Sequence, residues 1–572
     1  MTQHPSRPPP YLQPRPKAAP TLSDTSGISK AKSATPPYLS RPSSQSRPSS
    51  PTPPRAVNFD ASTKATRALI RRVFYPDTRA GSKDSCSLDE LLPPLTSSNE
   101  IDLQLYAIIA IVIKDTVHSW YGKITLDESF VEEVIQIVAH CTRAIEGRLR
   151  SVDLEGLVFD ELPQLVDDHI RAFRTAHSLS SPAQFRTDPR VVYHDLNPHP
   201  ALSPVPETSQ PSTVTEQSEH ETQYRQLLVQ SALAILLPTE DLDNACLRTL
   251  VADVIAETIL GNAIGGKLCE GYFIWGNISK LTTMVKARIE PKTTGEEIEV
   301  DTRGRLEKFG LLSERGKATR PPRGYRSTLS SVFWRALQYG YLLFIAVRFI
   351  IQGFIAASAR PRRSQLVSNM EASSPITKPV QSWPPPPLIN YKFFSLVSSI
   401  LDLPLRLPWL SGSLSLLQSH LVNGPLSVGA TDGILDQYIH HQLTTYALTP
   451  SLIPPLLSTL RTALFPNASL PLSPPPSSFQ PSETQIQATK RICAQDILSL
   501  LPPLLLPTLF PNMNPEERIR DVEHELDIWG DAYLNKHFLY RIVEVVVVRI
   551  LPEMGEGGEG PRELMEGRGV GV

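Results

Sequence analysis

The chain has 572 residues, a net charge of −2 and 55 prolines, the last about twice the share of ~5% that is usual in proteins. Its length allows roughly two to four domains of ordinary size. The near-neutral charge argues against a general nucleic-acid-binding protein, whose phosphate contacts require a basic excess. Five cysteines are scattered along the chain, a pattern typical of reduced thiols that face the cytosol, and no cleavable signal peptide is expected. The cysteines are Cys86, Cys141, Cys246, Cys269 and Cys493.

The first 57 residues are rich in proline and serine. Residues 1–55 hold 14 of the prolines and eight Lys or Arg against one acid, Asp24. Such a segment cannot bury enough apolar surface to offset the entropy lost on ordering, so we expect a disordered arm over 1–57. Its proline motifs are suitable ligands for SH3-type domains, which are possible partners.

The region 58–290 has the apolar spacing of helices. Ile101, Leu105 and Ile108 recur at intervals of three and four residues, which places them on one face of a helix. Residues 178–222 lose this periodicity and gain Ser, Pro, Thr and Gln, so we expect them to form an internal loop. No alternating strand pattern is found anywhere in the chain. The sequence therefore predicts an all-α, multi-helix fold.

Beyond this region, polar linkers alternate with further helical stretches. Residues 291–331 and 360–387 are expected to be linkers, the first of them basic. Helices broken by prolines resume over 388–552, around a low-complexity insert at 467–490. The glycine-rich tail 553–572 is expected to be disordered.

The segment 332–359 is the most apolar part of the chain, and a helix of this length could cross a bilayer core of ~30 Å. Arg348 near the middle makes spanning costly. It shares one narrow helical stripe with Gln338 and Gln352, which favours a helix lying in the membrane interface, or a bent hairpin. A spanning helix and a helix buried in the fold are the alternatives. The candidate membrane-contact residues are Trp334, Leu343, Phe344, Arg348, Ile350 and Phe354.

Arginines flank this apolar segment on both sides, among them Arg326 and Arg363. Guanidinium groups at the ends of an apolar helix suit the anionic headgroups of a cytosolic leaflet. We therefore expect these arginines to face the membrane, without selecting an orientation of the helix.

One motif resembles a phosphate-binding loop, because Gly261 to Lys267 has the spacing GxxxxGK. Such a loop needs a preceding strand and a Ser or Thr after the lysine to hold Mg²⁺, whereas here a helical pattern precedes and Leu268 follows. The glycines are better interpreted as a helix junction, and a nucleotidase is only a minor alternative. His440 and His441 have no partner at ligand spacing. We predict no catalytic residue, no cofactor and no metal site.

An ordered series of motifs runs through the first helical region. It consists of Arg71 to Pro76 (RRVFYP), Ile101 to Trp120, Val152 to Leu154, Asp160 to Pro163, His169, Phe173, and the stretch Tyr224 to Lys280. Together these motifs resemble the PXA (PX-associated) domain of sorting-nexin-like proteins, in its fungal type.

A second, more interrupted series lies near the C-terminus. It consists of Trp409, Leu460 and Arg461, Phe465 and Pro466, Asp531 to Tyr540 (DAYLNKHFLY), and Leu551 to Glu553. This series resembles the sorting-nexin C-terminal domain in a divergent form.

The resemblance implies a protein that acts in endosomal or vacuolar traffic or at organelle contacts. Its expected location is the cytosolic face of an endosomal, vacuolar or endoplasmic reticulum membrane. The resemblance also implies that the two helical modules pack around an apolar cavity that accepts lipid. The PX and RGS domains of larger family members are not found in this sequence. The predicted function is thus non-enzymatic membrane association with lipid binding. The alternative is a scaffold that docks trafficking proteins without binding lipid.

Overall fold

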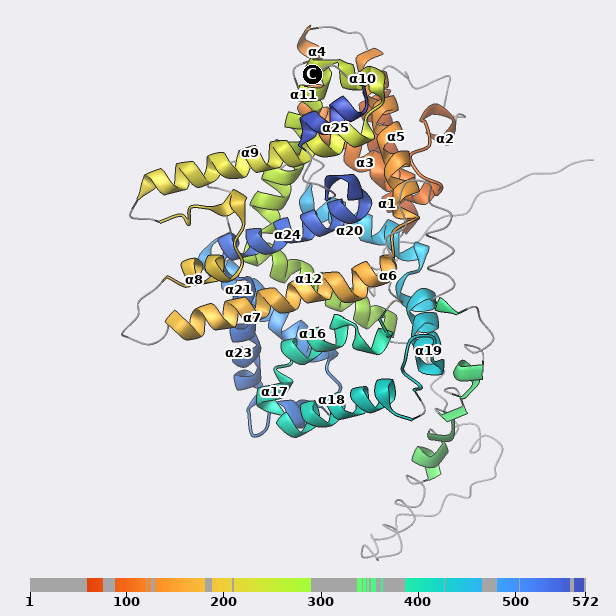
Figure 1. The fold of residues 1–572 in the computed structure, drawn as a ribbon, viewed down its shortest axis with the longest axis vertical. Coiled ribbons are helices and arrows are strands. Elements are labelled where there is room, and N and C mark those ends of the chain that lie inside the picture. The colour runs from red at the N-terminus through yellow and green to blue at the C-terminus, as the bar shows by residue number, and fades with distance from the viewer. Residues whose placement is uncertain are drawn as a thin grey trace, which may run out of the picture. The chain divides into compact units, whose positions relative to one another are not determined.

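The computed structural model describes residues 59–75, 88–119, 121–124, 129–180, 188–207, 210–289, most of 337–355, 362–363, most of 386–465 and most of 481–569. The predicted arm (1–57) and basic linker (291–331) lie outside the described residues. The described part of the chain is helical and contains no strand, which confirms the all-α prediction (Figure 1).

The first helical region holds the following elements. They are α1 (Phe59–Phe74), α2 (Leu88–Leu91), α3 (Asn99–Thr116), α4 (Tyr121–Ile124), α5 (Ser129–Leu149), α6 (Leu154–Gly156), the π-helix η1 (Leu157–Glu161), α7 (Leu162–Ser180), α8 (Pro189–Leu196), the 3₁₀-helix η2 (Pro200–Leu202), α9 (Pro211–Leu236), α10 (Thr239–Asp243), α11 (Ala245–Asp253), the π-helix η3 (Val254–Leu268) and α12 (Gly271–Ile289).

The C-terminal region resumes after a stretch of short helical pieces between 337 and 355. Its elements are η4 (Leu388–Asn390), α16 (Lys392–Ile400), α17 (Leu403–Arg406), α18 (Pro408–Asn423), α19 (Ile434–Gln442), η5 (Leu443–Ala447), η6 (Pro450–Leu452), α20 (Ile453–Leu464), α21 (Glu483–Leu500), α22 (Leu506–Leu509), α23 (Pro515–Glu525), η9 (Leu526–Trp529), α24 (Ala532–Ile550), η10 (Pro552–Met554) and α25 (Pro561–Gly567).

Helices α1, α3 and α5 form the first core, as the apolar spacing predicts. Ile70 of α1, Ala107 of α3 and Val131 of α5 belong to one buried cluster. On its other side, α3 presents Ile111 to Leu464 and Phe465, which come from the end of α20. The apolar surface of α3 therefore exceeds what one core needs, because it serves two cores.

The described residues from Phe59 onward form one compact unit. Figure 1 shows α24, near the C-terminus, running among helices of the first region. Trp275 of α12 packs with Cys493 of α21 and Leu526 of η9. The two helical regions thus share their cores and do not stand as separate modules.

The described residues of 178–222 are largely helical, whereas the sequence predicts a loop there. Asp188 caps α8 by accepting a hydrogen bond from the backbone N–H of Arg190, and Pro189 occupies the first turn. The first half of α9 also lies in this segment. Its face toward the core is polar, with Gln217 and Glu221 buried, so no apolar periodicity marks it in the sequence.

Two further segments are ordered where disorder or an insert was expected. Helix α21 begins inside the predicted insert 467–490, at a capping box formed by Ser482 and Gln485. In the predicted disordered tail 553–572, α25 buries Met565 against α9 residues. The guanidinium of Arg568 donates to the backbone carbonyls of Ala234 and Leu237 at 2.7 and 2.8 Å. Both segments are ordered by capping and long-range contact, which composition does not reveal.

Candidate membrane-contact site

Helix α24 carries the C-terminal motif DAYLNKHFLY and lies in a seam between α7, α8, α9 and η3. Asp531 caps the helix by accepting a hydrogen bond from the backbone N–H of Tyr533 at 2.9 Å. The side chains that α24 buries include Asn535, His537 and Tyr540. A helix that buries this many polar groups must supply each with a partner.

The carboxylate of Glu221 is the centre of this seam. It accepts hydrogen bonds from Tyr540 Oη at 2.6 Å and Lys536 Nζ at 3.0 Å, and it lies 2.9 Å from Arg225 Nη1. Burial by itself would raise the pKa of Glu221, but Lys536, Tyr540 and Arg225 outweigh it and hold the pKa below its ordinary value. Gly265 of η3 makes room, because a Cβ there would lie 2.8 Å from Tyr540 Oη.

A second part of the seam is rich in histidine. His169 Nδ1 lies 2.7 Å from the hydroxyl of Tyr193, and its ring stacks on Trp529 at 4.7 Å. Burial lowers the pKa of His169 to about 4. Burial, together with neighbours that include His194, lowers the pKa of His537 to about 3. Both imidazoles are therefore neutral near pH 7, and they fill the seam as packed aromatic groups.

The seam brings together residues of both motif series, including His169 of the first and His537 of the second. Of its charged members, Arg225 and Lys536 fall inside the motif stretches named in the sequence, whereas Glu221 does not. The spacing of Gln217, Glu221 and Arg225 at i, i+4 and i+8 was the available signal, since it puts all three on one helical face. The contacts of these residues are structural, and they hold the two regions together.

The GxxxxGK motif has a helix-capping role in the structure. Lys267 Nζ donates to the carbonyl oxygens of Ala463 and Leu464, both at 2.8 Å, at the C-terminal end of α20. Burial lowers the pKa of this lysine. The glycines lie within the π-helix η3, so the motif forms no loop around a phosphate. Among the described residues, no group of three or more His, Cys, Asp or Glu is placed to hold a metal ion.

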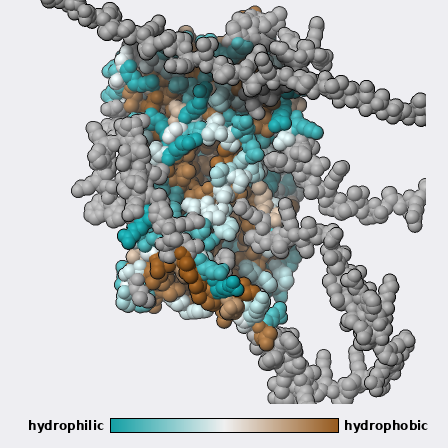
Figure 2. Space-filling model, turned by 90° about the vertical axis from the view of Figure 1, so that its right-hand side faces the viewer, coloured by the Kyte–Doolittle hydropathy of each residue, from teal (hydrophilic) through white to brown (hydrophobic). Residues whose placement is uncertain are grey.

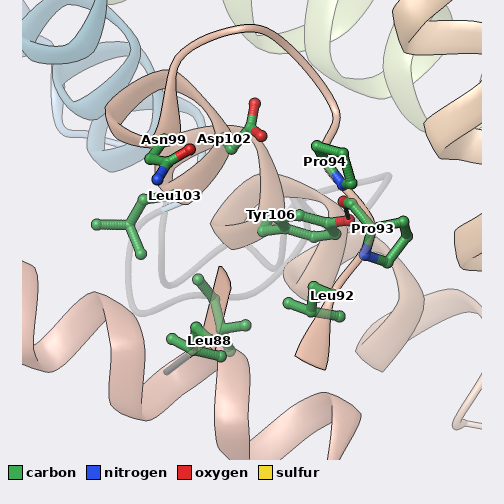
Figure 3. Close-up of a pocket in the computed structure, with 9 residues that line it drawn as sticks. Leu88, Leu92, Pro93, Pro94, Asn99, Asp102, Leu103 and Tyr106 are labelled. Atoms are coloured by element: carbon green, nitrogen blue, oxygen red, sulfur yellow. Dashed lines mark hydrogen bonds between the residues drawn. The ribbon is translucent and has the colours of Figure 1, made fainter. Parts of the chain in front are cut away.

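A small pocket lies between α1, α2 and α3 (Figure 3). Its volume is about 40 Å³, whereas ligand pockets usually measure ~300–1,000 Å³. Two of its polar side chains are already paired: Asp102 accepts from the backbone N–H groups of Leu95 and Thr96, and the Tyr106 hydroxyl donates to the carbonyl of Pro93. This pocket is too small for an acyl chain.

The described residues of the apolar segment 337–355 lie at the surface. Leu343 and Phe344 are exposed to 65% and 61%. Arg348 is also exposed, Phe354 is half-buried, and Trp334 and Ile350 lie outside the described residues. The residues described between 337 and 352 are thus all exposed, and cover by another helix begins only at Gly353 and Phe354.

No helix in the described part of the chain combines the length and the apolar character needed to cross a bilayer.

The C-terminal end of this segment is attached to the fold. The ring of Phe354 packs on Tyr438 of α19 at 5.1 Å. Gly353 permits this approach, because a Cβ there would lie 2.5 Å from the Tyr438 ring. Beyond it, Arg363 is buried, lies 3.6 Å from the carboxylate of Glu155 and donates to the hydroxyl of Tyr391.

The burial of Arg363 corrects the expectation for this one flanking arginine, whereas Arg362 beside it is exposed. The guanidinium of Arg363 pairs with the first region, through Glu155 of α6, and with the C-terminal region, through Tyr391. Glu155 also lies 2.7 Å from His440 Nδ1. The ion pair with Glu155 and the hydrogen bond to Tyr391 therefore attach the C-terminal end of the apolar segment to both helical regions.

Comparison with known proteins locates one domain. Residues 98–281 match the model of the PXA domain family. PXA domain protein 1 of Schizosaccharomyces pombe is 29% identical over 160 residues, which are 27% of this chain and 30% of that protein. The match thus spans less than a third of the curated relative, and no solved structure matches. Residues 98–281 of this chain are therefore a PXA domain.

Proposed function

We propose that this chain is a non-enzymatic protein of intracellular traffic that associates with the cytosolic face of an endosomal, vacuolar or endoplasmic reticulum membrane. The PXA domain supports the trafficking role. The observation that carries the membrane contact is the exposure of apolar side chains along 337–355, on a segment whose end is anchored to the fold. Membrane lipids are the expected ligands of this segment.

Exposed apolar surface of this extent is rare on soluble monomers and usually marks a binding surface. Side chains buried in a membrane interface gain about 25 cal/mol per Å² of apolar area removed from water. Arg348 is compatible with this arrangement, because its long side chain can reach the headgroups while the stem stays among acyl chains. The exposed apolar residues are Leu337, Tyr339, Tyr341, Leu343, Phe344, Ile345, Val347, Ile351 and Ile355.

Contact at the surface is favoured over lipid held inside the fold. The seam where the two regions meet is filled by Glu221, Lys536 and Tyr540 and their partners, and the pocket near Tyr106 is small. A bilayer, by contrast, needs only an accessible apolar surface. Lipid bound in a cavity between the modules stays a prediction, and lipid mass spectrometry of the purified protein is its direct measurement.

Vesicle flotation of the full chain tests the proposal. The double variant L343D/F344D puts two carboxylates on the apolar surface, and each must be withdrawn from water for the segment to bind. We expect it to lower the vesicle-bound fraction at least about tenfold, with an unchanged thermal unfolding curve. A matched control is L227D on α9, where Leu227 is also exposed.

Three outcomes separate the alternatives. Loss of binding in L343D/F344D but not in L227D supports the proposal. Equal binding by all three proteins would exclude this segment as the contact. If the unmodified chain binds no vesicle of any composition, the scaffold that docks trafficking proteins becomes the better function.

A further inference from the structure

Helices α17 and α18 carry a surface that the proposed contact does not use. The sixteen residues of α18, Pro408–Asn423, include no Asp, Glu, Lys or Arg, and none of them is buried. On α17, Leu405 is one of the most exposed apolar residues of the described chain. A helix in contact with water usually carries charges on its outer face, so an uncharged and uncovered helix needs another partner.

The leucines of α18 form a stripe. Leu410, Leu414, Leu417 and Leu421 follow at i, i+4, i+7 and i+11, the spacing of a face that normally packs into a core. Here Leu417 is exposed to 53%, and the other three are half-buried or exposed. Figure 2 shows apolar side chains gathered at the lower end of the molecule, where Figure 1 places α17 and α18.

A second group of apolar side chains lies on a different side of α18. Trp409 and Leu416 are seven residues apart and hence on one face, and Leu416 is exposed to 74%. The polar positions between these groups hold serines and no lysines, namely Ser411, Ser413, Ser415 and Ser419. The helix has one basic side chain, His420 in its last turn, and no lysine or arginine with which to attract an anionic headgroup or an acidic partner.

The inner side of this surface is fixed to the protein by charge and hydrogen bonds. Arg406 of α17 pairs with Asp521 of α23 at 2.7 Å, and its guanidinium lies over the Phe510 ring. Gln418 of α18 donates to the carbonyl oxygen of Ile389 at 2.8 Å. Arg406 and Gln418 thus hold the two helices to the protein, while Leu405, Trp409 and Leu416 are left exposed.

The surface is continuous with the base of the proposed contact segment. Arg363, which follows that segment, donates to the carbonyl of Pro386 at 2.9 Å. Three residues further on, Ile389 accepts the hydrogen bond from Gln418 of α18. The short stretch 386–389 therefore contacts both Arg363, at the base of the proposed contact segment, and α18.

We infer that α17 and α18 form a second membrane-contact surface, whose partner is the interface of a loosely packed phospholipid bilayer. This inference rests on the proposed membrane association and specifies the lipid property that is recognised. A helix with leucines and serines but no lysine or arginine gains its binding mainly from apolar insertion between headgroups. Its affinity depends on gaps in headgroup packing and not on anionic lipid.

Flotation of the full chain compares small vesicles of dioleoyl phosphatidylcholine, with and without an added anionic phospholipid, with large vesicles of a saturated phosphatidylcholine, at about 0.05 M and about 0.5 M NaCl. The triple variant W409S/L416S/L417S removes three exposed apolar side chains, which together are worth well over a tenfold change in binding. We expect it to lose at least about tenfold in binding to the loosely packed vesicles. The matched control L227S removes a leucine exposed to 54% on α9.

The outcomes distinguish this inference from the proposed membrane association on which it rests. Binding to loosely packed vesicles that is insensitive to salt, and lost in the triple variant only, supports it. If the unmodified chain and the triple variant bind equally, the inference is wrong while membrane association through 337–355 stands. Binding that needs anionic lipid and weakens in salt also overturns it. A change of oligomeric state in the triple variant, seen by light scattering without vesicles, would assign the surface to a second copy of the chain instead.

Discussion

The seam around α24 and the surface of α17 and α18 differ in which side chains they bury: the seam buries polar side chains, and the surface exposes apolar ones. In the seam, Glu221 and His537 are polar and buried. On the surface, Leu405 and Leu416 are apolar and exposed. Each buried polar group of the seam that carries charge has a counter-charge, whereas the exposed leucines have no cover among the described residues.

The difference shows which region serves the fold and which serves binding. Polar groups such as Glu221 and Tyr540 can be buried only against particular partners, so they specify how the first region joins α24. Exposed leucines add nothing to the stability of the isolated chain, and they are explained by a partner outside it. Stability measurements should therefore respond to the seam, and binding measurements to the surface.

The largest effect on stability is expected from E221A. Without this carboxylate, Arg225 and Lys536 lose the group that neutralises them inside the seam. We expect the free energy of unfolding in urea to fall by about 3–5 kcal/mol. The control E257A removes a half-exposed partner of the same Arg225 and should cost less than about 1 kcal/mol. Equal losses in both variants would mean that the seam is not held by its central carboxylate.

The next effect concerns close packing of η3 against α24. In G265A the new Cβ would lie 2.8 Å from Tyr540 Oη and 3.0 Å from Glu221 Oε1. We expect a loss of about 1–3 kcal/mol in the free energy of unfolding. The control G147A lies on α5, where nothing comes within 4 Å of the new Cβ, and it should be neutral or stabilise the helix by up to about 1 kcal/mol. A stable G265A would show that the seam can widen.

The third prediction is a dependence of stability on pH. The folded-state pKa values of His169 (about 4) and His537 (about 3) lie below the ordinary value of 6.5. As the pH falls below 6.5, the unfolded chain binds protons before the folded chain does. The free energy of unfolding therefore keeps its full value above that pH. It decreases as the pH falls toward the folded-state pKa values, by up to about 1.4 kcal/mol per pH unit for each histidine.

Urea unfolding across about pH 5 to 7.5 measures this slope, in a window above the titration of most carboxylates. H169Q should reduce the slope, because one of the two histidines no longer takes up a proton on unfolding. An unfolding free energy that does not change across the window would show that the seam admits water.

The smallest effect is expected on the exposed surface. L416S should change the free energy of unfolding by no more than about 0.5 kcal/mol, because Leu416 is surrounded largely by water in both states. In the seam, L534A should cost about 2–5 kcal/mol, since Leu534 is fully buried. A large loss in L416S would mean that α18 is covered by another part of the chain, which would contradict the contrast between the two regions.

Several features of the fold could be predicted from the sequence. The spacing of Ile101, Leu105 and Ile108 located α3, because an apolar stripe is a local property of a helix. The motif that includes His169 identified the PXA domain. The apolar character of 337–355 was evident from its composition, and the structure adds that Leu343 and Phe344 are exposed.

Other features depend on contacts between distant residues. The first half of α9 faces the core with Gln217 and Glu221, which the sequence presents as polar and therefore as loop-like. The tail helix α25 is held by Met565 against a core formed about three hundred residues earlier in the chain. Neither segment has a local pattern that indicates order.

By itself, the sequence determined the helical class, the PXA domain and the apolar segment, because periodicity, motif order and hydrophobicity are local properties of the chain. Only the tertiary structure decided that Lys267 caps α20 and that Arg363 is buried beside Glu155. It also decided that the uncharged helix α18 is left at the surface. The reason is physical: whether a charge is paired, or a leucine covered, depends on residues that the chain brings close only when it folds.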